Sequence, residues 1–314
     1  MACVAAFYRF ARFSTEEVRS LRTRLLKLGR ERGVLGTVLL AEEGINGTIS
    51  GSEAGLEALL AHLRSDSRLA DLAIRRSSCD TSPFFRFKVR LKREIVTMGV
   101  AGVDPLEQVG TYVPPADWNA LVRDPQTLLI DTRNTYEVEV GTFAGALHPA
   151  TRHFRDFPAW VERVLPELMA KRQPRRLALF CTWGIRCEKA TAHLLRQGYG
   201  GVHHLRGGIL GYLEETPPEQ SLWQGECFVF DQRATVNHQL LPGSHDLCHA
   251  CRMPLSPADR QHPLYVIGEC CHHCANQRTA ADRDRYAERH RQQEWAHGVG
   301  ERHLGRVFPP AGEP

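Results

Sequence analysis

The first hundred residues show strand-like and helix-like hydrophobic patterns in the order β-α-β-β-α-β. The strand patterns lie at 4–10, 36–43, 47–51 and, as a strand pair, 84–96. A turn is expected at 44–46, between the second and third patterns. Apolar residues recur at helical spacing at 14–33 and 53–66. This order predicts a ferredoxin-like domain over residues 1–104.

A different pattern follows a run of Gly, Pro and Asp at 99–105, which is expected to be a linker. Strand patterns alternate with helix patterns beyond it, the strands at 127–133, 175–181 and 201–207 and the helices at 154–169 and 187–197. Such alternation predicts a parallel sheet with helices on both faces. We expect this α/β domain to occupy residues 105–222.

The remaining residues change character again. A β-hairpin pattern at 226–236 lies in a cysteine-rich segment, which we expect to span 223–280 and to bind a metal. The tail at 281–314 is polar, charged and compatible with a helix, and we expect it to be only partly ordered. The whole chain is predicted to be a multidomain protein of mixed α/β and α+β class.

Composition narrows the function classes only slightly. The 314 residues include 40 Lys and Arg against 36 Asp and Glu, and the net charge of +4 is too small to identify a nucleic-acid-binding protein by itself. No stretch approaches about 18 consecutive apolar residues, so we expect no membrane span. Ten cysteines without a secretory signal pattern indicate a reducing compartment, and we expect a cytoplasmic protein.

One predicted strand concentrates positive charge. A period of two places four cations on one face, Arg86, Lys88, Arg90 and Lys92. Apolar side chains fall on the other face, Phe85, Phe87, Val89 and Leu91. A solvated outer face would explain this alternation. Because like charges on one face repel and no acid compensates them there, we favour contact with the phosphate backbone of RNA.

The segment 180-FCTWGIRC-187 holds the best candidate for a nucleophile. Cys181 follows an apolar strand pattern, and reactive groups in parallel α/β sheets gather beyond the carboxyl ends of the strands. Loop N–H groups, the start of the next helix and Arg186 would stabilise a thiolate or an anionic persulfide, and Gly184 permits a tight turn. A buried, unreactive cysteine is the alternative, which these neighbours disfavour.

Residues around this nucleophile have candidate roles of their own. Cys187 is either a second catalytic thiol, a resolving thiol or a small residue in the first helical turn. Arg186 is a candidate anion-binding group, because a guanidinium offers several donors in fixed geometry. Asp131 and Arg133 are expected to brace the active loop rather than take part in catalysis. Two helix residues are expected to be solvated, Glu188 and Lys189.

Two C-x-x-C pairs, 248-CHAC-251 and 271-CHHC-274, have the spacing of a zinc ribbon. Each pair would form a knuckle, and four thiolates would complete a closed tetrahedral site. We therefore expect structural zinc rather than free thiols or a labile disulfide at Cys248, Cys251, Cys271 and Cys274. A complete thiolate set leaves no open position for catalysis.

The central domain resembles a rhodanese domain. The segments 131-DTRNTYEVEVGTFAGALHP-149 and 205-LRGGILGY-212, with the strand–Cys–loop–helix arrangement around Cys181, carry this resemblance. The resemblance implies that Cys181 occupies the position that carries a persulfide in rhodaneses. Cys187 lies where that family more often has serine or another small residue.

Over residues 4–275 the chain is similar to the rhodanese-related tRNA uridine hydroxylases. The similarity is carried by 41-AEEGINGTISG-51, 86-RFKVRLKREIV-96, 110-GTYVPPADWNAL-121 and 181-CTWGIRCEKA-190. It implies tRNA as partner and oxygen-dependent hydroxylation of the wobble uridine to 5-hydroxyuridine. The chain departs from the usual CTGGIRC of that family, since Trp183 replaces a glycine. This bulky side chain would narrow the pocket or stack on a base.

Three functions follow from these features. A hydroxylase would use Cys181 to add to C6 of uracil and so make C5 reactive towards oxygen. A persulfide-carrying sulfurtransferase would need no oxygen, and an RNA-binding adaptor would catalyse nothing. Oxygen chemistry usually requires iron, copper or flavin, but the sequence contains no recognisable motif for an organic cofactor. It also indicates no protein partner. We predict the tRNA hydroxylase, with molecular oxygen as co-substrate.

Overall fold

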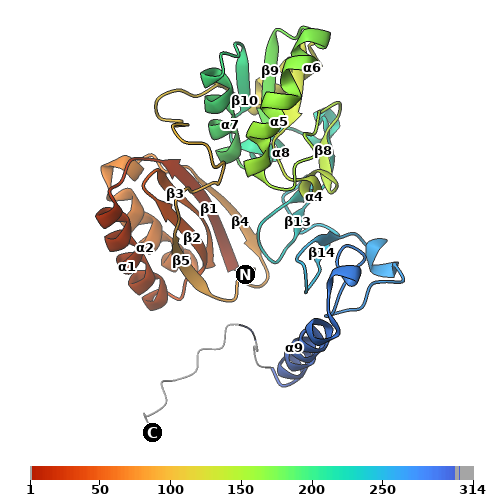
Figure 1. The fold of residues 1–314 in the computed structure, drawn as a ribbon. Helices are drawn as coiled ribbons and strands as arrows, with labels where there is room; N and C mark the ends of the chain where they lie inside the picture. Colours follow the sequence, from red (N-terminus) through yellow and green to blue (C-terminus); the bar gives the residue numbers. More distant parts are fainter. Residues whose placement is uncertain (1, 301–303, 305–314) are drawn as a thin grey trace.

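The computed structural model describes residues 2–300 and 304. A five-stranded sheet covered on one face by two helices forms its N-terminal part (Figure 1). The elements are β1 (Ala2–Phe10), α1 (Thr15–Glu31), β2 (Leu35–Ala41), β3 (Gly44–Gly51), α2 (Glu53–Arg64), β4 (Ile74–Cys79) and β5 (Phe87–Leu91). The strand order β4-β1-β3-β2-β5 confirms the ferredoxin-like fold and adds β5, which runs parallel to β2, as an edge strand.

Both helices pack against the same face of this sheet. Ser14 begins α1 with a capping box to Glu17, which satisfies N–H groups that the helix itself leaves unpaired. The buried stripe of each helix, represented by Leu25 in α1 and Leu59 in α2, joins Phe7 of β1 in one core. Among residues 2–300 no helix covers the opposite face of the sheet, which faces the central part of the chain (Figure 1).

Two sequence predictions in this part are wrong. The turn expected at 44–46 lies inside β3, and the chain turns at residues 42–43 instead. Position 44 requires glycine, because φ is +148° there and a Cβ would collide with the Arg9 carbonyl oxygen. The strand pair expected at 84–96 is the single strand β5. The fourth ferredoxin strand is β4, an edge strand whose sequence IRRSSC lacks an apolar alternation.

A four-stranded parallel sheet of order β6-β10-β9-β7 forms the central part. Its strands are β6 (Thr111–Val113), β7 (Thr127–Asp131), β9 (Arg176–Phe180) and β10 (Val202–Leu205). Its helices are α3 (Pro115–Arg123), α4 (Thr135–Val138), α5 (Phe157–Arg163), α6 (Leu165–Arg172), α7 (Ile185–Arg196) and α8 (Gly208–Glu215). The single helix expected at 154–169 is therefore divided, with a break at Val164.

Helices cover both faces of this sheet, as the burial of successive residues in β7 and β9 requires. Leu177 and Leu179 of β9 join the core formed with α5 and α7, whereas Ala178 and Phe180 join the core formed with α3 and α8. The parallel order and the two covered faces confirm the rhodanese-like fold predicted for this region.

Short hairpins and one helix follow. The strand β11 (Trp223–Gly225) pairs antiparallel with the distant β8 (Gly141–Phe143). Two hairpins follow: β12 (Cys227–Phe228) pairs with β13 (Thr235–Val236), and β14 (Asp246–Leu247) pairs with β15 (Pro254–Leu255). The helix α9 (Ala280–Gly298) begins the predicted polar tail. The end of that tail, 301–303 and 305–314, lies outside the described residues. None of the helices described is long and apolar enough to cross a membrane.

Candidate active site

A cavity of about 670 Å³ lies between three parts of the chain. One wall is the uncovered face of the N-terminal sheet, where Ala6, Thr48 and Thr37 are cross-strand neighbours. The second wall is the loop after β9, from Cys181 to Arg186, and the third is the arm between β12 and β13, residues 229–233. The volume lies within the range typical of small-molecule sites.

Cys181 is poised as a thiolate at the wall of this cavity. It directly follows β9, and the N–H of Gly184 donates to its Sγ over 3.1 Å. Burial opposes ionisation of this thiol. Hydrogen bonding from Cys187, the Arg186 charge, and the N–H groups of Trp183 and Cys187 outweigh burial and lower the pKa of Cys181 to about 5.

Cys187 is placed to support Cys181. Its side chain is fully buried in the first turn of α7, and its Sγ lies 3.6 Å from the Thr132 hydroxyl. Burial, together with the hydrogen bond to Cys181 and the charge there, raises the pKa of Cys187 well above its usual value. Both thiols are free. The pair is therefore a thiolate that accepts a hydrogen bond from a neutral thiol.

Arg186 is held by an acid that the sequence analysis did not single out. Its two terminal nitrogens donate to the Glu137 carboxylate over 2.6 and 2.7 Å, and both residues are buried. Burial opposes ionisation of Glu137, but the Arg186 guanidinium lowers its pKa below the usual value. Arg186 therefore contributes positive charge beside Cys181, and it also contacts the Thr182 hydroxyl over 3.3 Å.

Asp131 and Arg133 form a fully buried ion pair of 2.6 Å. Arg133 also donates to the carbonyl oxygens of Glu137 and Gly141, over 3.3 and 2.6 Å. The pair thus fixes the backbone that carries Glu137, and Glu137 in turn holds Arg186. The structure places Asp131 and Arg133 outside the cavity lining, in the position of a brace.

Gly184 lets the loop approach the N-terminal sheet closely. Its φ of +106° is strained for any residue with a Cβ, and a Cβ there would lie 2.9 Å from the Tyr8 hydroxyl. That hydroxyl donates to Glu188 over 2.7 Å. Glu188 was expected to be solvated but is half-buried. Burial raises the pKa of Glu188 even though hydrogen bonds from Tyr8 and Tyr112 oppose the rise.

The expectation for Lys189 is also wrong, because its side chain is only 2% exposed. Its ammonium contacts the Glu43 and Glu94 carboxylates over 2.7 and 2.5 Å and donates to the Val96 carbonyl over 3.2 Å. Glu43 follows β2, and Glu94 lies in the segment that leaves the N-terminal sheet. This buried ion triad therefore fastens α7 to the N-terminal part of the chain.

Trp183 lines the cavity between the two sheets. The Arg75 guanidinium of β4 lies 4.9 Å from its ring, and the Tyr8 ring meets it edge to face at 6.4 Å. Its indole N–H has no hydrogen-bond partner among the described residues. The bulky residue that departs from the usual family motif is thus accommodated by contacts with the N-terminal sheet.

The basic residues of the β5 region do not line this cavity, but Arg86 and Lys88 line an adjoining hollow that shares Thr37 and Phe84 with it. There are four such residues, Arg86, Lys88, Arg90 and Lys92. All of them are exposed, and none forms an ion pair with an acid in residues 2–300. Lys88 pairs in register with Thr37, a cavity residue, so its side chain shares the face that carries the cavity. Phe87 and Val89 pack against the helices as expected, but Phe85 and Leu91 are 39% and 41% exposed.

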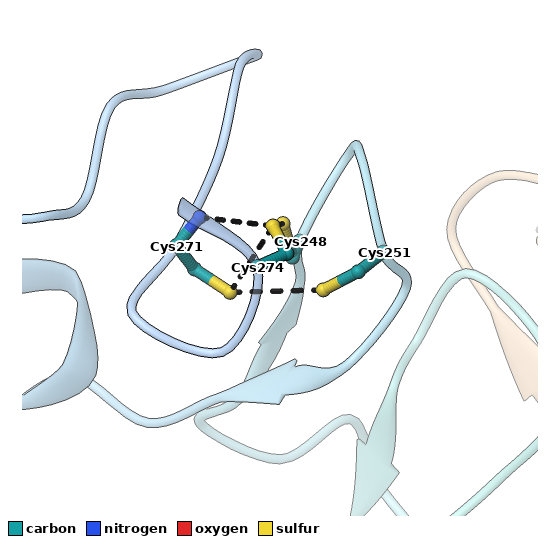
Figure 2. Close-up of side chains that lie close together, drawn as sticks. All are labelled: Cys248, Cys251, Cys271 and Cys274. Atoms are coloured by element: carbon teal, nitrogen blue, oxygen red, sulfur yellow. Dashed lines mark hydrogen bonds between the residues drawn. The ribbon is translucent and has the colours of Figure 1, made fainter. Parts of the chain in front are cut away.

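The four cysteines of the two C-x-x-C pairs meet in one buried cluster (Figure 2). Their sulfurs lie 3.7 Å apart for Cys251 and Cys271, and 4.0 Å apart for Cys248 and Cys274 and for Cys271 and Cys274. Zn–S bonds of about 2.3 Å in a tetrahedron place the sulfurs roughly 3.8 Å apart, which matches this cluster. Because all four sulfurs lie within 4.8 Å of one another, the cluster could hold a metal ion.

Comparisons with known proteins connect these features. Residues 2–95 match the UPF0176 acylphosphatase like domain, and residues 115–215 match the rhodanese-like domain. A tRNA uridine(34) hydroxylase of Mesorhizobium japonicum is 55% identical over 303 residues, which is 96% of either chain. The protein of that name from Parasynechococcus marenigrum is 54% identical over 92% of either chain, and the one from Gluconobacter oxydans is 53% identical over 96%. The chain belongs to the tRNA uridine(34) hydroxylase family.

Membership of this family favours the hydroxylase over the sulfurtransferase. The structure shows which site residues sequence reasoning overlooked. Glu137 is the clearest, and one signal for it was present, because Asn134 and Glu137 have the spacing of a capping box, which the structure contains. The sequence around Tyr8 and Lys189 contains no motif that predicts their roles, since their partners come from a different part of the chain.

Proposed function

We propose that this chain hydroxylates the wobble uridine of tRNA to 5-hydroxyuridine, with molecular oxygen as co-substrate and Cys181 as the catalytic thiol. The single observation that carries the proposal is the Cys181 thiolate on the wall of a cavity large enough for a nucleobase. The membership of this chain in the hydroxylase family supports the proposed reaction and the proposed substrate.

The chemistry begins with the Cys181 thiolate, which adds to C6 of uracil and makes C5 nucleophilic. C5 then forms a bond to dioxygen. Two electrons and two protons from a thiol reductant cleave the O–O bond, which releases one water and leaves a hydroxyl on C5. Loss of the C5 proton and departure of Cys181 restore the ring. Overall, uridine, oxygen and two thiols give 5-hydroxyuridine, water and a disulfide.

The neighbouring residues act on the thiolate rather than on the substrate. Cys187 and the Gly184 N–H donate hydrogen bonds to it, and Arg186 supplies positive charge. Asp131 and Arg133 hold the backbone of Glu137, so they keep Arg186 in place. In this scheme Cys187 is a positioning residue and does not need to form a bond with substrate.

Three further assignments accompany this reaction. The basic residues of the β5 region bind the tRNA backbone, which supplies the anionic partner that their exposed, unpaired charges lack. The four-cysteine cluster holds structural zinc, which ties the two knuckles together and takes no part in the reaction. The enzyme acts in the cytoplasm, consistent with ten free cysteines.

A complementation experiment tests the proposal. Total tRNA from a deletion strain that carries the wild-type gene, Cys181→Ser or Cys187→Ser is digested and analysed by nucleoside mass spectrometry. We expect 5-hydroxyuridine derivatives to vanish on deletion, to return with wild type and to stay absent with Cys181→Ser. Unchanged tRNA in the deletion strain would refute the proposal, and thiocyanate formation from thiosulfate and cyanide would then point to a sulfurtransferase.

A trapping experiment tests the thiol addition separately. A tRNA with 5-fluorouridine at the wobble position has no C5 proton to lose, so the normal departure of Cys181 is blocked and a cysteine adduct at C6 should persist. We expect a covalent complex through Cys181 in the wild type and none in Cys181→Ser. If the wild type hydroxylates normal tRNA but forms no adduct, the C6 addition is wrong while the reaction stands.

A further inference from the structure

An exposed aromatic side chain stands at the cavity beside Cys181. Phe230 lies in the arm between β12 and β13, and 61% of its surface is exposed although it lines the cavity. The Arg186 guanidinium lies 5.8 Å from its ring. Neither Cys181 nor the ion pairs around it require an apolar ring at this place.

The ring is held on a firm support. Phe230 meets Phe228 edge to face at 5.2 Å, and Phe228 meets Tyr136 in the same way at 5.1 Å. The next residue, Asp231, is buried in an ion pair of 2.5 Å with Arg233, which also donates to Ser77 of β4 over 2.8 Å. The arm is therefore fixed to both neighbouring parts of the chain, and it presents one aromatic face in advance of binding.

Exposed cations also lie at and near this cavity. The basic residues of the β5 region lie along the N-terminal sheet. Arg155 lines the cavity wall, is exposed and forms no ion pair with an acid in residues 2–300. Exposed cations combined with an aromatic face are the features by which proteins bind single-stranded nucleic acids, because every base can stack and every phosphate can pair.

We propose that Phe230 stacks on a base of the anticodon loop next to the target uridine. The RNA strand crosses the mouth of the cavity between Lys88 and Arg155, which contact phosphates on either side of that base. This inference rests on the proposed function and adds to it a base-stacking residue and a further phosphate contact.

The test uses the full-length enzyme and an anticodon stem-loop RNA. Binding is measured by fluorescence anisotropy, and hydroxylation gives kcat and KM, for Phe230→Ala, Phe230→Trp and Arg155→Ala. Trp295→Ala is the matched control, because this side chain of α9 is 67% exposed and does not line the cavity. Thermal melting of every variant verifies that it is folded.

We expect Phe230→Ala to raise Kd and KM by about 5- to 150-fold, the range that loss of one base–aromatic stack produces, with a much smaller change in kcat. Phe230→Trp should restore both, and Trp295→Ala should match wild type. Arg155→Ala should lower the slope of log Kd against log salt by about 0.7, as expected for one phosphate contact with a single strand.

Failures of the inference and of the proposed function give different results. If wild type hydroxylates the RNA and Phe230→Ala leaves Kd and KM unchanged, stacking is wrong while the function stands. A lower kcat with unchanged Kd, not restored by tryptophan, would mean that Phe230 only shapes the cavity, which also overturns the inference. If wild type binds but never hydroxylates the RNA, the proposed function itself fails.

Discussion

Replacing Cys187 by alanine should raise the pKa of Cys181 and leave its environment otherwise intact. The substitution removes a neutral donor to a buried thiolate. A hydrogen bond to a charged group contributes about 1.5–3 kcal/mol. Since one pKa unit corresponds to about 1.4 kcal/mol, the pKa of Cys181 should rise by about 1 to 2 units from its value of about 5. Cys187→Ser retains a donor and should stay close to wild type.

The pKa can be read from the rate at which iodoacetamide alkylates Cys181 between pH 4 and pH 9. Peptide mass spectrometry separates this residue from the other nine cysteines. Only the thiolate reacts, so the rate falls as pH falls through the pKa: near pH 5 in wild type and near pH 6 to 7 in the alanine variant.

Two results would refute this reasoning. A wild-type midpoint near the usual value of about 8.5 would mean that the loop does not stabilise the thiolate. Equal midpoints in wild type and Cys187→Ala would mean that Cys187 is no donor. Hydroxylation activity at pH 8 provides a further test of the role of Cys187, because Cys181 should remain ionised at that pH in wild type, Cys187→Ala and Cys187→Ser. Loss of hydroxylation at pH 8 in both Cys187 variants would assign Cys187 a covalent role instead.

Three other predictions follow from the structure. Lys189→Met should lower the free energy of unfolding by about 3 kcal/mol in urea titrations, because two partly buried carboxylates lose their ammonium; a change below about 1 kcal/mol would contradict a stabilising triad. Cys271→Ser should lose the metal in elemental analysis, whereas Cys270→Ser should retain about one zinc per chain, and equal metal content in both would disprove the assigned ligands. Gly184→Ala should reduce kcat at least about tenfold through contact with the Tyr8 hydroxyl. Gly198→Ala has a similar positive φ but open space around it, and equal losses in both would attribute the effect to backbone strain alone.

The fold could be predicted where the pattern of buried residues is local in the sequence. Amphipathic helices and apolar strands of the two sheets carry their pattern within a few turns or residues, and both fold classes follow from their order. The misplaced elements lack that pattern. The edge strand β4 has no fully buried residue, so its sequence is mostly polar. Gly44 resembled a turn residue, although it supports a close approach between strands.

The site was only partly predictable for a related reason. Cys181, Gly184 and Cys187 lie within seven consecutive residues, from the end of β9 to the first turn of α7, so their chemistry is visible in a short segment. The partners that complete the site are distant in sequence: Arg186 bonds Glu137 across 49 residues, and Glu188 bonds Tyr8 across 180. A charged residue on a helix is usually solvated, and only the tertiary structure shows that α7 is covered by the N-terminal sheet.

The central claim is that Cys181 directs oxygen to C5 of the wobble uridine. The most direct measurement incubates purified enzyme with unmodified tRNA and a thiol reductant under ¹⁸O₂ and weighs the nucleosides by mass spectrometry. The account predicts 5-hydroxyuridine that carries one ¹⁸O atom with wild type, and unmodified uridine with Cys181→Ser. Unlabelled oxygen in the product, or full activity of Cys181→Ser, would contradict it.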